Sequence, residues 1–297
     1  MKELEFINTI KKNIGNDYIG DDCAFLKEYG LVISQDSLVE NIHFKREWIT
    51  PFQLGYKSVS VNISDILASG AEPKFLTIAL SLPQNIDNKF IDEFYKGANK
   101  ASLGAKIIGG DITGADKIFI SITAIGNTKG RNISSRKYAK NNYIVITKGL
   151  HGASSRGLKD LQKNVMKSNW IQHHLEPQLE EEFSKNIAQN AVHPYAMMDT
   201  SDGLADALFK IAEASNAKII LDYNKIPGAD IFTQEEVLFG GEDYKLVAAV
   251  SKEDLCKINN YSIIGKVVNR NDKYYLEVGN YKYSSYDELK SFNHFGG

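Results

Sequence analysis

The chain has 297 residues, of which 43% are hydrophobic and 24% are charged, and this length allows two domains or one large one. The 35 Lys and Arg against 37 Asp and Glu give a formal net charge of −2, so no basic excess supports nucleic-acid binding. No apolar run approaches the ~18 residues that span a membrane, and the first residues lack a signal-peptide pattern. The two cysteines make neither a disulfide framework nor a zinc site. We therefore expect a cytoplasmic globular protein that binds neither membrane nor nucleic acid.

The first half of the chain alternates between helical and strand patterns. Helices are predicted over 2–13, 52–70 and 88–104, and strands over 31–34, 75–82, 105–109 and 117–126. In the second of these helices Asp65 shares a face with Asn62 and Ser69, apart from the apolar stripe. A carboxylate there must face solvent or be held by a cation or hydrogen bonds, because burying it bare is very costly.

Residues 127–137 lack apolar periodicity, and we place the boundary between two domains there, as 1–136 and 137–297. The second half again mixes strands and helices, which indicates an α/β architecture. Its strands are predicted over 143–149, 196–198, 218–222, 263–268 and 274–278 and within 238–250, and its helices within 157–191 and over 203–215.

The segment AMMDTSDGLADAL (196–208) predicts a strand that stops at Asp199, a turn, and a helix opened by Gly203. Ser201 or Asp202 is suited to cap that helix. A helix N-terminus suits phosphate, and two aspartates three residues apart suit a hard cation with oxygen ligands. A capped helix with solvated acids is the alternative.

Four aspartates each follow or interrupt a strongly apolar strand beside Gly, Ser or Thr, and Glu242 precedes another such strand. They are Asp22, Asp36, Asp111 and Asp199. Strand ends in an α/β architecture converge on one rim, where these acids would repel one another unless cations intervene or some stay protonated. Magnesium ions bridging phosphates would relieve that repulsion, as in phosphoryl transfer. The chain has neither a Walker-type sequence nor the protein-kinase motif set.

Taken in order, six segments resemble the thiamine-monophosphate kinases, of the superfamily that includes aminoimidazole ribonucleotide synthetase and selenophosphate synthetase. They are GDDCAFL (20–26), SQDSLVENIHF (34–44), KSVSVNISDILASGAEP (57–73), IIGGDIT (107–113), MMDTSDGLADAL (197–208) and LFGGEDYKL (238–246). The resemblance covers nearly the whole chain. It departs at Gln35, where the family usually has Thr, at Ser69, where Met is common, and in the loop HGASSRGL, to which we assign no role.

The resemblance implies ATP-dependent phosphorylation of thiamine monophosphate to thiamine diphosphate by direct in-line transfer. Several Mg²⁺ ions would assist, and no side chain would act as nucleophile. It also implies a homodimer in which the mixed sheets of the N-terminal α/β domains pair into a barrel-like core. A second α/β domain would pack alongside.

The resemblance also implies three groups of site residues. Magnesium would be held by Asp22, Ser34, Gln35, Asp36, Asp65, Asp111, Asp199 and Asp202. ATP would contact Tyr95, Gly110, Asp111, Arg136 and Ser201. The thiamine substrate would contact His43, Glu242 and Phe292, the last by stacking on an aromatic ring.

Two other functions stay open at this point. Another enzyme of the superfamily would use ATP to activate a carbonyl oxygen or selenide. Selenide chemistry usually uses an N-terminal Cys in a glycine-rich loop, whereas Cys23 lies within GDDCAF and is expected to be a small core residue. A non-catalytic sensor of nucleotides or thiamine phosphates would bind without turnover. A purely structural protein would leave the strand-end acids without a purpose.

Overall fold

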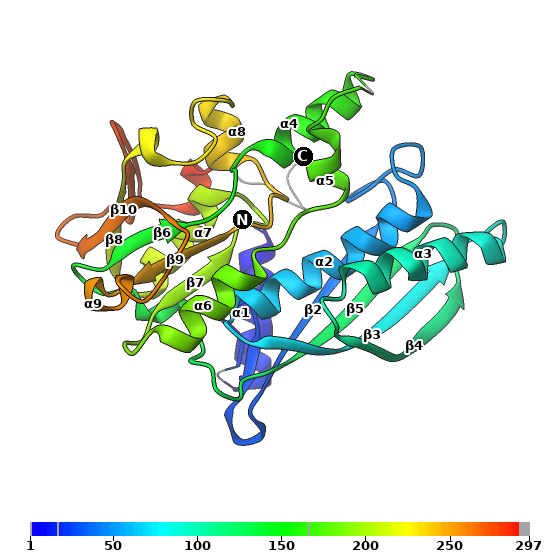
Figure 1. Cartoon of the computed structure of the whole chain (residues 1–297), viewed down its shortest axis with the longest axis horizontal. Helices are drawn as coiled ribbons and strands as arrows, with labels where there is room; N and C mark the ends of the chain where they lie inside the picture. Colours follow the sequence, from blue (N-terminus) through cyan, green and yellow to red (C-terminus); the bar gives the residue numbers. More distant parts are fainter. Residues whose placement is uncertain (1, 17, 166, 291–297) are drawn as a thin grey trace.

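Two β-sheets, one in each half of the chain, organise the structure (Figure 1). The computed structural model describes residues 2–16, 18–165 and 167–290. Across those residues, we find no helix with the length and apolar character needed to cross a membrane. The two-domain α/β fold expected from the sequence is confirmed.

The first sheet is mixed and has the strand order β1-β2-β5-β3-β4. Its strands are β1 (Ala24–Leu26), β2 (Leu31–Val39), β3 (Glu72–Leu82), β4 (Lys106–Gly114) and β5 (Phe119–Asn127). The pair β3–β4 is parallel, and the other pairs are antiparallel. Alternate residues of β5, such as Ile120 and Ile122, are buried beneath helices that cover one face. Within the single chain this sheet is open, with β4 as an exposed edge and no closed barrel among the described strands.

Two helices, α2 (Pro51–Ala68) and α3 (Asn88–Ala101), cover that face of the sheet (Figure 1). Thr50 begins α2 with a capping box. The two helix backbones approach closely because each contributes a glycine to the crossing: a Cβ on Gly55 would lie 1.9 Å from the Phe94 carbonyl oxygen, and Gly97 is the matching residue of α3. The far side of α2 contacts the second domain, so almost the whole helix is buried.

The second sheet has the order β12-β11-β8-β10-β6-β9-β7 and is antiparallel apart from the parallel pair β11–β8 among the described strands. Its strands are β6 (Ile144–Thr147), β7 (Ala196–Asp199), β8 (Ala217–Leu221), β9 (Leu246–Val250), β10 (Ser262–Asn269), β11 (Leu276–Val278) and β12 (Tyr281–Tyr283). Both faces of the central strands are buried. Met197 belongs to the core shared with the first domain, and Met198 belongs to the core under α7.

The remaining helices surround the second sheet, except α1 at the start of the chain. They are α1 (Lys2–Ile14), α4 (Ala153–Gln162), α5 (Ile171–Leu175), α6 (Glu181–Asn190), α7 (Leu204–Ala214), α8 (Gln234–Phe239) and α9 (Lys252–Leu255). Short 3-10 turns lie at Lys27–Tyr29, Arg136–Tyr138, Tyr223–Lys225 and Tyr286–Glu288. The region predicted as one interrupted helical stretch over 157–191 is therefore three helices.

Two strand predictions were wrong in a way that affects the site. β2 continues to Val39 and β4 continues to Gly114, so Asp36 and Asp111 lie inside strands rather than after them. Both strands carry polar residues on a face that no helix of this chain covers. In the sequence, the change from apolar to polar residues looks the same as the end of a strand. The acids therefore do not converge as a single rim of strand ends.

Candidate functional site

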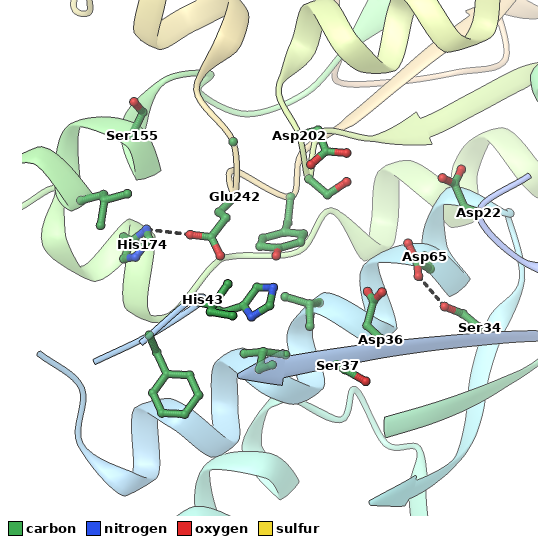
Figure 2. A pocket seen from close by; sticks show the side chains of 18 of the residues that line it. Asp22, Ser34, Asp36, Ser37, His43, Asp65, Ser155, His174, Asp202 and Glu242 are labelled. Atoms are coloured by element: carbon green, nitrogen blue, oxygen red, sulfur yellow. Dashed lines mark hydrogen bonds and ion pairs between the residues drawn. The ribbon is translucent and has the colours of Figure 1, made fainter. Parts of the chain in front are cut away.

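A cavity of about 810 Å³ lies between the two domains (Figure 2). Its walls come from β2 and the loop after it, from α2, α4 and α5, and from the turns at 201–202 and 241–244. One end is dominated by aspartates and the other by His43, His174, Glu242 and aromatic side chains. We call these the acid end and the ring end.

At the acid end, three aspartates from distant segments meet. Asp22 precedes β1, Asp65 lies on α2 and Asp199 ends β7, and each offers a carboxylate oxygen within 4.8 Å of the others. Asp36, on β2, faces the same cavity. Domain packing thus brings together acids that are far apart in the chain, from Asp22 to Asp199.

Each of the three clustered carboxylates accepts a hydrogen bond that fixes its orientation. Ser34 Oγ donates to Asp65 Oδ2, and Ser64 Oγ donates to Asp199 Oδ2 at 2.6 Å. Arg136 Nη2 donates to Asp22 Oδ1 at 2.6 Å. The acids are therefore held in place before any ligand arrives.

The pKa values at the acid end reflect charge gathered away from water. Burial raises the pKa of Asp65 well above its usual range, and the nearby Asp36 and Asp199 raise it further. Burial, followed by Asp22, raises the pKa of Asp199 to about 7. Burial and Asp202 raise the pKa of Asp36 to about 6. Oxygen-only donors with unrelieved negative charge fit a hard divalent cation such as Mg²⁺.

The turn before α7 differs from the sequence expectation. Gly203, with φ 109°, is the residue that precedes the helix, and no side chain caps it, so neither Ser201 nor Asp202 is a cap. Asp202 accepts a hydrogen bond from Lys210 Nζ at 3.1 Å. The Ser201 carbonyl accepts from the Glu242 N–H at 2.7 Å. Both residues line the cavity, near the uncapped N-terminus of α7.

At the ring end, Glu242 is the central residue (Figure 2). Lys57 Nζ lies 3.3 Å from Glu242 Oε1, and His174 Nδ1 lies 3.3 Å from Glu242 Oε2. His43 Nδ1 accepts from the Val39 N–H at 3.0 Å, which leaves its Nε2 edge as the donor in the neutral ring. Lys57 and His174 were not singled out by the sequence.

The loop that carries Glu242 has unusual backbone conformations. Glu242 has φ 64° and Tyr244 has φ 49°, both in the left-handed region. Asp243, between them, accepts from the Gly152 N–H at 2.5 Å and from the Ser154 N–H at 2.8 Å. The loop HGASSRGL, to which the sequence assigned no role, thus anchors the GGEDY segment and holds Glu242 in its left-handed conformation.

Most of the predicted site residues line this cavity. They are Asp22, Ser34, Gln35, Asp36, Asp65, Arg136, Ser201, Asp202, His43 and Glu242, and Asp199 joins them through the aspartate cluster. The Gln35 side chain accepts from Thr123 Oγ1 on β5 and points away from the face that carries Asp36, which leaves its backbone to face the cavity. Phe292 lies outside the described residues.

Three predicted residues lie elsewhere in this chain: the cavity lining, in the part that the structure describes, does not include Tyr95, Gly110 or Asp111. Tyr95 is on α3, and the other two are on β4, which β3 and β5 separate from β2. A single chain therefore does not bring Asp111 together with Asp36, Asp65 and Asp199.

Comparisons with known proteins follow the same organisation. The family models "AIR synthase related protein, N-terminal domain" and "AIR synthase related protein, C-terminal domain" match residues 20–128 and 140–276. Thiamine-monophosphate kinase of Aquifex aeolicus is 32% identical over 89% of this chain and 91% of its own. That of Bacillus subtilis is 34% identical over 80% and 78%. The solved structure of AaThiL complexed with AMPPCP and TMP is 31% identical, with a TM-score of 0.87 over 99% of this chain and 98% of that one. The chain belongs to the thiamine-monophosphate kinase family.

Proposed function

We propose that the protein transfers the γ-phosphoryl group of ATP to thiamine monophosphate and releases thiamine diphosphate. The relatives that match over most of the chain are named for this activity, and a closely similar structure holds AMPPCP and TMP. The observation that carries the proposal is the two-ended cavity, in which one end suits metal-bound phosphates and the other an aromatic ring system.

The acid end is the place for magnesium and phosphate. Asp22, Asp36, Asp65, Asp199 and Asp202 are the residues that would hold the ions, with further contributions from Ser34 and the backbone of Gln35. Bound Mg²⁺ would supply charge neutralisation for the transferred group. Arg136 and the N-terminus of α7, beside Ser201, provide further positive potential for phosphate oxygens.

The substrate's own phosphate oxygen is the nucleophile, so the chain needs no nucleophilic side chain. What the residues contribute is alignment, which is worth roughly 7–11 kcal/mol when two reactants are held in line. We assign His43 and Glu242 to holding the substrate at the ring end, and Phe292, which lies outside the described residues, to stacking on a ring of the substrate. This division keeps the acceptor phosphate at the middle of the cavity, between the ring end and the acid end.

We further propose that two copies pair through their N-terminal sheets into a barrel-like core. The edge strand β4 is open and exposes Ile108 and Ile112, at 57% and 65%, which is a hazard for a lone chain. Pairing there would carry Asp111, together with Gly110 and Tyr95, toward the acid end of the partner's cavity. This arrangement accounts for site residues that a single chain leaves outside.

The domain division that we propose is 1–136 and 137–297, since the two sheets are joined through residues 128–143. Arg136, the last residue of the first domain, donates to Asp22 of the same domain. Because ATP is the co-substrate, we expect the protein to work in the cytoplasm.

The decisive experiment is to incubate the purified protein with ATP, magnesium and thiamine monophosphate and to measure thiamine diphosphate. Formation at enzymatic rates supports the proposal. Calorimetric binding of both ligands without product would instead support a sensor, and turnover of aminoimidazole precursors or selenide would support another enzyme of the superfamily.

A further inference from the structure

Lys57 is a charged residue with no exposure to solvent, and the mechanism above gives it no task. It lies on α2 in the N-terminal domain, and its ammonium is 3.3 Å from both carboxylate oxygens of Glu242. A buried ammonium is very costly unless a counter-charge and hydrogen-bond acceptors surround it. Among the described residues, Glu242 is the carboxylate that forms an ion pair with Lys57.

The third member of the cluster is His174, on α5 of the second domain, which is also buried. Its Nε2 lies 3.3 Å from Lys57 Nζ. An ammonium has only donors, so Nε2 must carry the lone pair and Nδ1 the proton. That proton is shared between Glu242 Oε2 at 3.3 Å and Ser154 Oγ at 3.0 Å. His174 is therefore a neutral donor with one defined tautomer.

The charges within this cluster balance. Lys57 contributes one positive charge, Glu242 one negative charge, and neutral His174 none. Burial, with Lys57 beside it, lowers the pKa of His174 to about 4, which keeps the ring neutral at pH 7. Burial raises the pKa of Glu242, but the charge of Lys57 and its hydrogen bond act against this, and the pKa lies below the usual range. Glu242 thus presents an ionised carboxylate in surroundings that carry no net charge.

We propose that Lys57 and His174 are positioning residues, which hold the Glu242 carboxylate as a directed hydrogen-bond acceptor for the ring amino group of the substrate. They act through Glu242, and the inference rests on the proposed function. Thiamine carries both an aminopyrimidine and a cationic thiazolium. Because the Glu242 charge is already balanced by Lys57, its role toward the substrate is to accept from an N–H donor rather than to neutralise a cation. The two donors come from different domains, so domain packing itself sets the orientation.

A double-mutant cycle tests whether Lys57 acts through Glu242. We expect Lys57→Met and Glu242→Gln each to raise KM for thiamine monophosphate about tenfold, with kcat and KM for ATP within about twofold of the wild type. The double variant should also show about a tenfold rise rather than about a hundredfold one. It removes both charges together, so no charge is stranded if Lys57→Met alone folds poorly. Additive effects on KM, or an equal loss in KM for ATP, would overturn the positioning role.

Two variants of His174 test its tautomer. The amide nitrogen of Asn falls near Nδ1 and that of Gln near Nε2, so His174→Asn keeps the donor toward Glu242 and His174→Gln loses it. We expect KM for thiamine monophosphate to stay within about threefold in the first and to rise about tenfold in the second. The opposite ranking would overturn the assignment.

Two further measurements separate this inference from the proposed function. Lys218 is also nearly buried and pairs with Asp272 and Glu277 outside the cavity, so Lys218→Met is the matched control, with KM unchanged. Nitrogen-15 NMR of the histidine rings in the ligand-free protein should show His174 neutral and protonated on Nδ1. A proton on Nε2 would overturn the inference even in an active enzyme. A wild-type protein that makes no thiamine diphosphate would overturn the proposed function, whatever the tautomer.

Discussion

The two ends of the cavity bury charge in different ways. At the ring end, Lys57 supplies the counter-charge for Glu242 from within the chain, and the carboxylate keeps a pKa below its usual range. At the acid end, Asp36, Asp65 and Asp199 all have raised pKa values, because burial and neighbouring acids outweigh the donors around them. In the folded chain the negative charge at the ring end is balanced by a lysine, whereas the negative charge at the acid end is not balanced.

This difference indicates which parts of the site depend on a ligand. Buried acids that lie together either take up protons or bind a cation, and a divalent cation is the ligand that oxygen donors at this spacing would take. The ring end needs no such partner, since its orientation is set by donors from α2 and α5. The two ends should therefore respond differently to mutation, to pH and to magnesium.

The largest effect should come from neutralising the acid cluster. We expect Asp65→Asn or Asp199→Asn to lower kcat by about 10²–10³, because each removes a ligand of the Mg²⁺ that would neutralise the charge developing in the transition state. Stability without magnesium should not fall, since each change relieves repulsion among buried acids. Product formation at fixed magnesium and thermal melts with and without magnesium measure both effects. Asp116→Asn, at an exposed turn, is the control, and wild-type rates in both cluster variants would contradict the site.

The second effect is a pH dependence of stability in the magnesium-free protein. Asp199 and Asp36 have folded-state pKa values of about 7 and about 6, above the ~3.9 of an unfolded chain. Between these values the folded state binds more protons, so the free energy of unfolding falls as pH rises from about 4 to 7. Each kcal/mol corresponds to about 2–4 °C in Tm for a chain of this size.

Magnesium should remove this pH dependence, because it binds the ionised carboxylates and stabilises the folded state by mass action. Melting curves from pH 5 to 8, with EDTA or with magnesium, give the comparison. In Asp199→Asn the slope without magnesium should be shallower. A Tm without magnesium that rises with pH across this window would show that the acids are not buried together.

The motifs of the sequence located both ends of the cavity, but two structural features could not be read from it. Asp36 lies in the middle of β2, and the residues from Gln35 to Ser37 are all polar. They are polar because one face of this part of the strand lies toward the site and the other face lies on the uncovered side of the sheet. Alternation by strand period assumes that one face is apolar, so the prediction ended the strand too early. The acids meet through domain packing rather than at one rim.

Lys57 and His174 gave no sequence signal for a different reason. A lysine in a predicted helix is most often solvent-exposed, and only the packing of α2 between the two domains shows that position 57 is buried. Lys57 and His174 are 117 residues apart in the chain and meet only through a tertiary contact. By contrast, the apolar stripe predicted for this helix is buried, as Val59, Ile63 and Ile66 show, because helical period already places these residues on one face.

Breaking the proposed dimer should affect the acid end alone. Ile112→Lys places a charge on the exposed face of β4 in both copies, and we expect it to shift the protein to monomers and to lower kcat about tenfold or more. Binding of thiamine monophosphate at the ring end should persist, since one chain builds that end. Sedimentation and calorimetry test the two statements. A fully active monomer would mean that Tyr95, Gly110 and Asp111 take no part in the site.

The smallest effect should come from displacing the Glu242 loop without changing any charge. A Cβ on Gly241 would lie 2.8 Å from the Ser201 carbonyl oxygen, the same oxygen that accepts from the Glu242 N–H. Gly241→Ala must therefore shift the loop by a few tenths of an ångström, and we expect KM for thiamine monophosphate to rise about two- to tenfold. Stabilisation by magnesium should be unchanged, because the acid cluster does not depend on this contact. Gly241→Ala could instead weaken the stabilisation by magnesium and leave KM for thiamine monophosphate unaltered. The two ends would then not be independent, because the displacement would reach the acid end through the Ser201 turn.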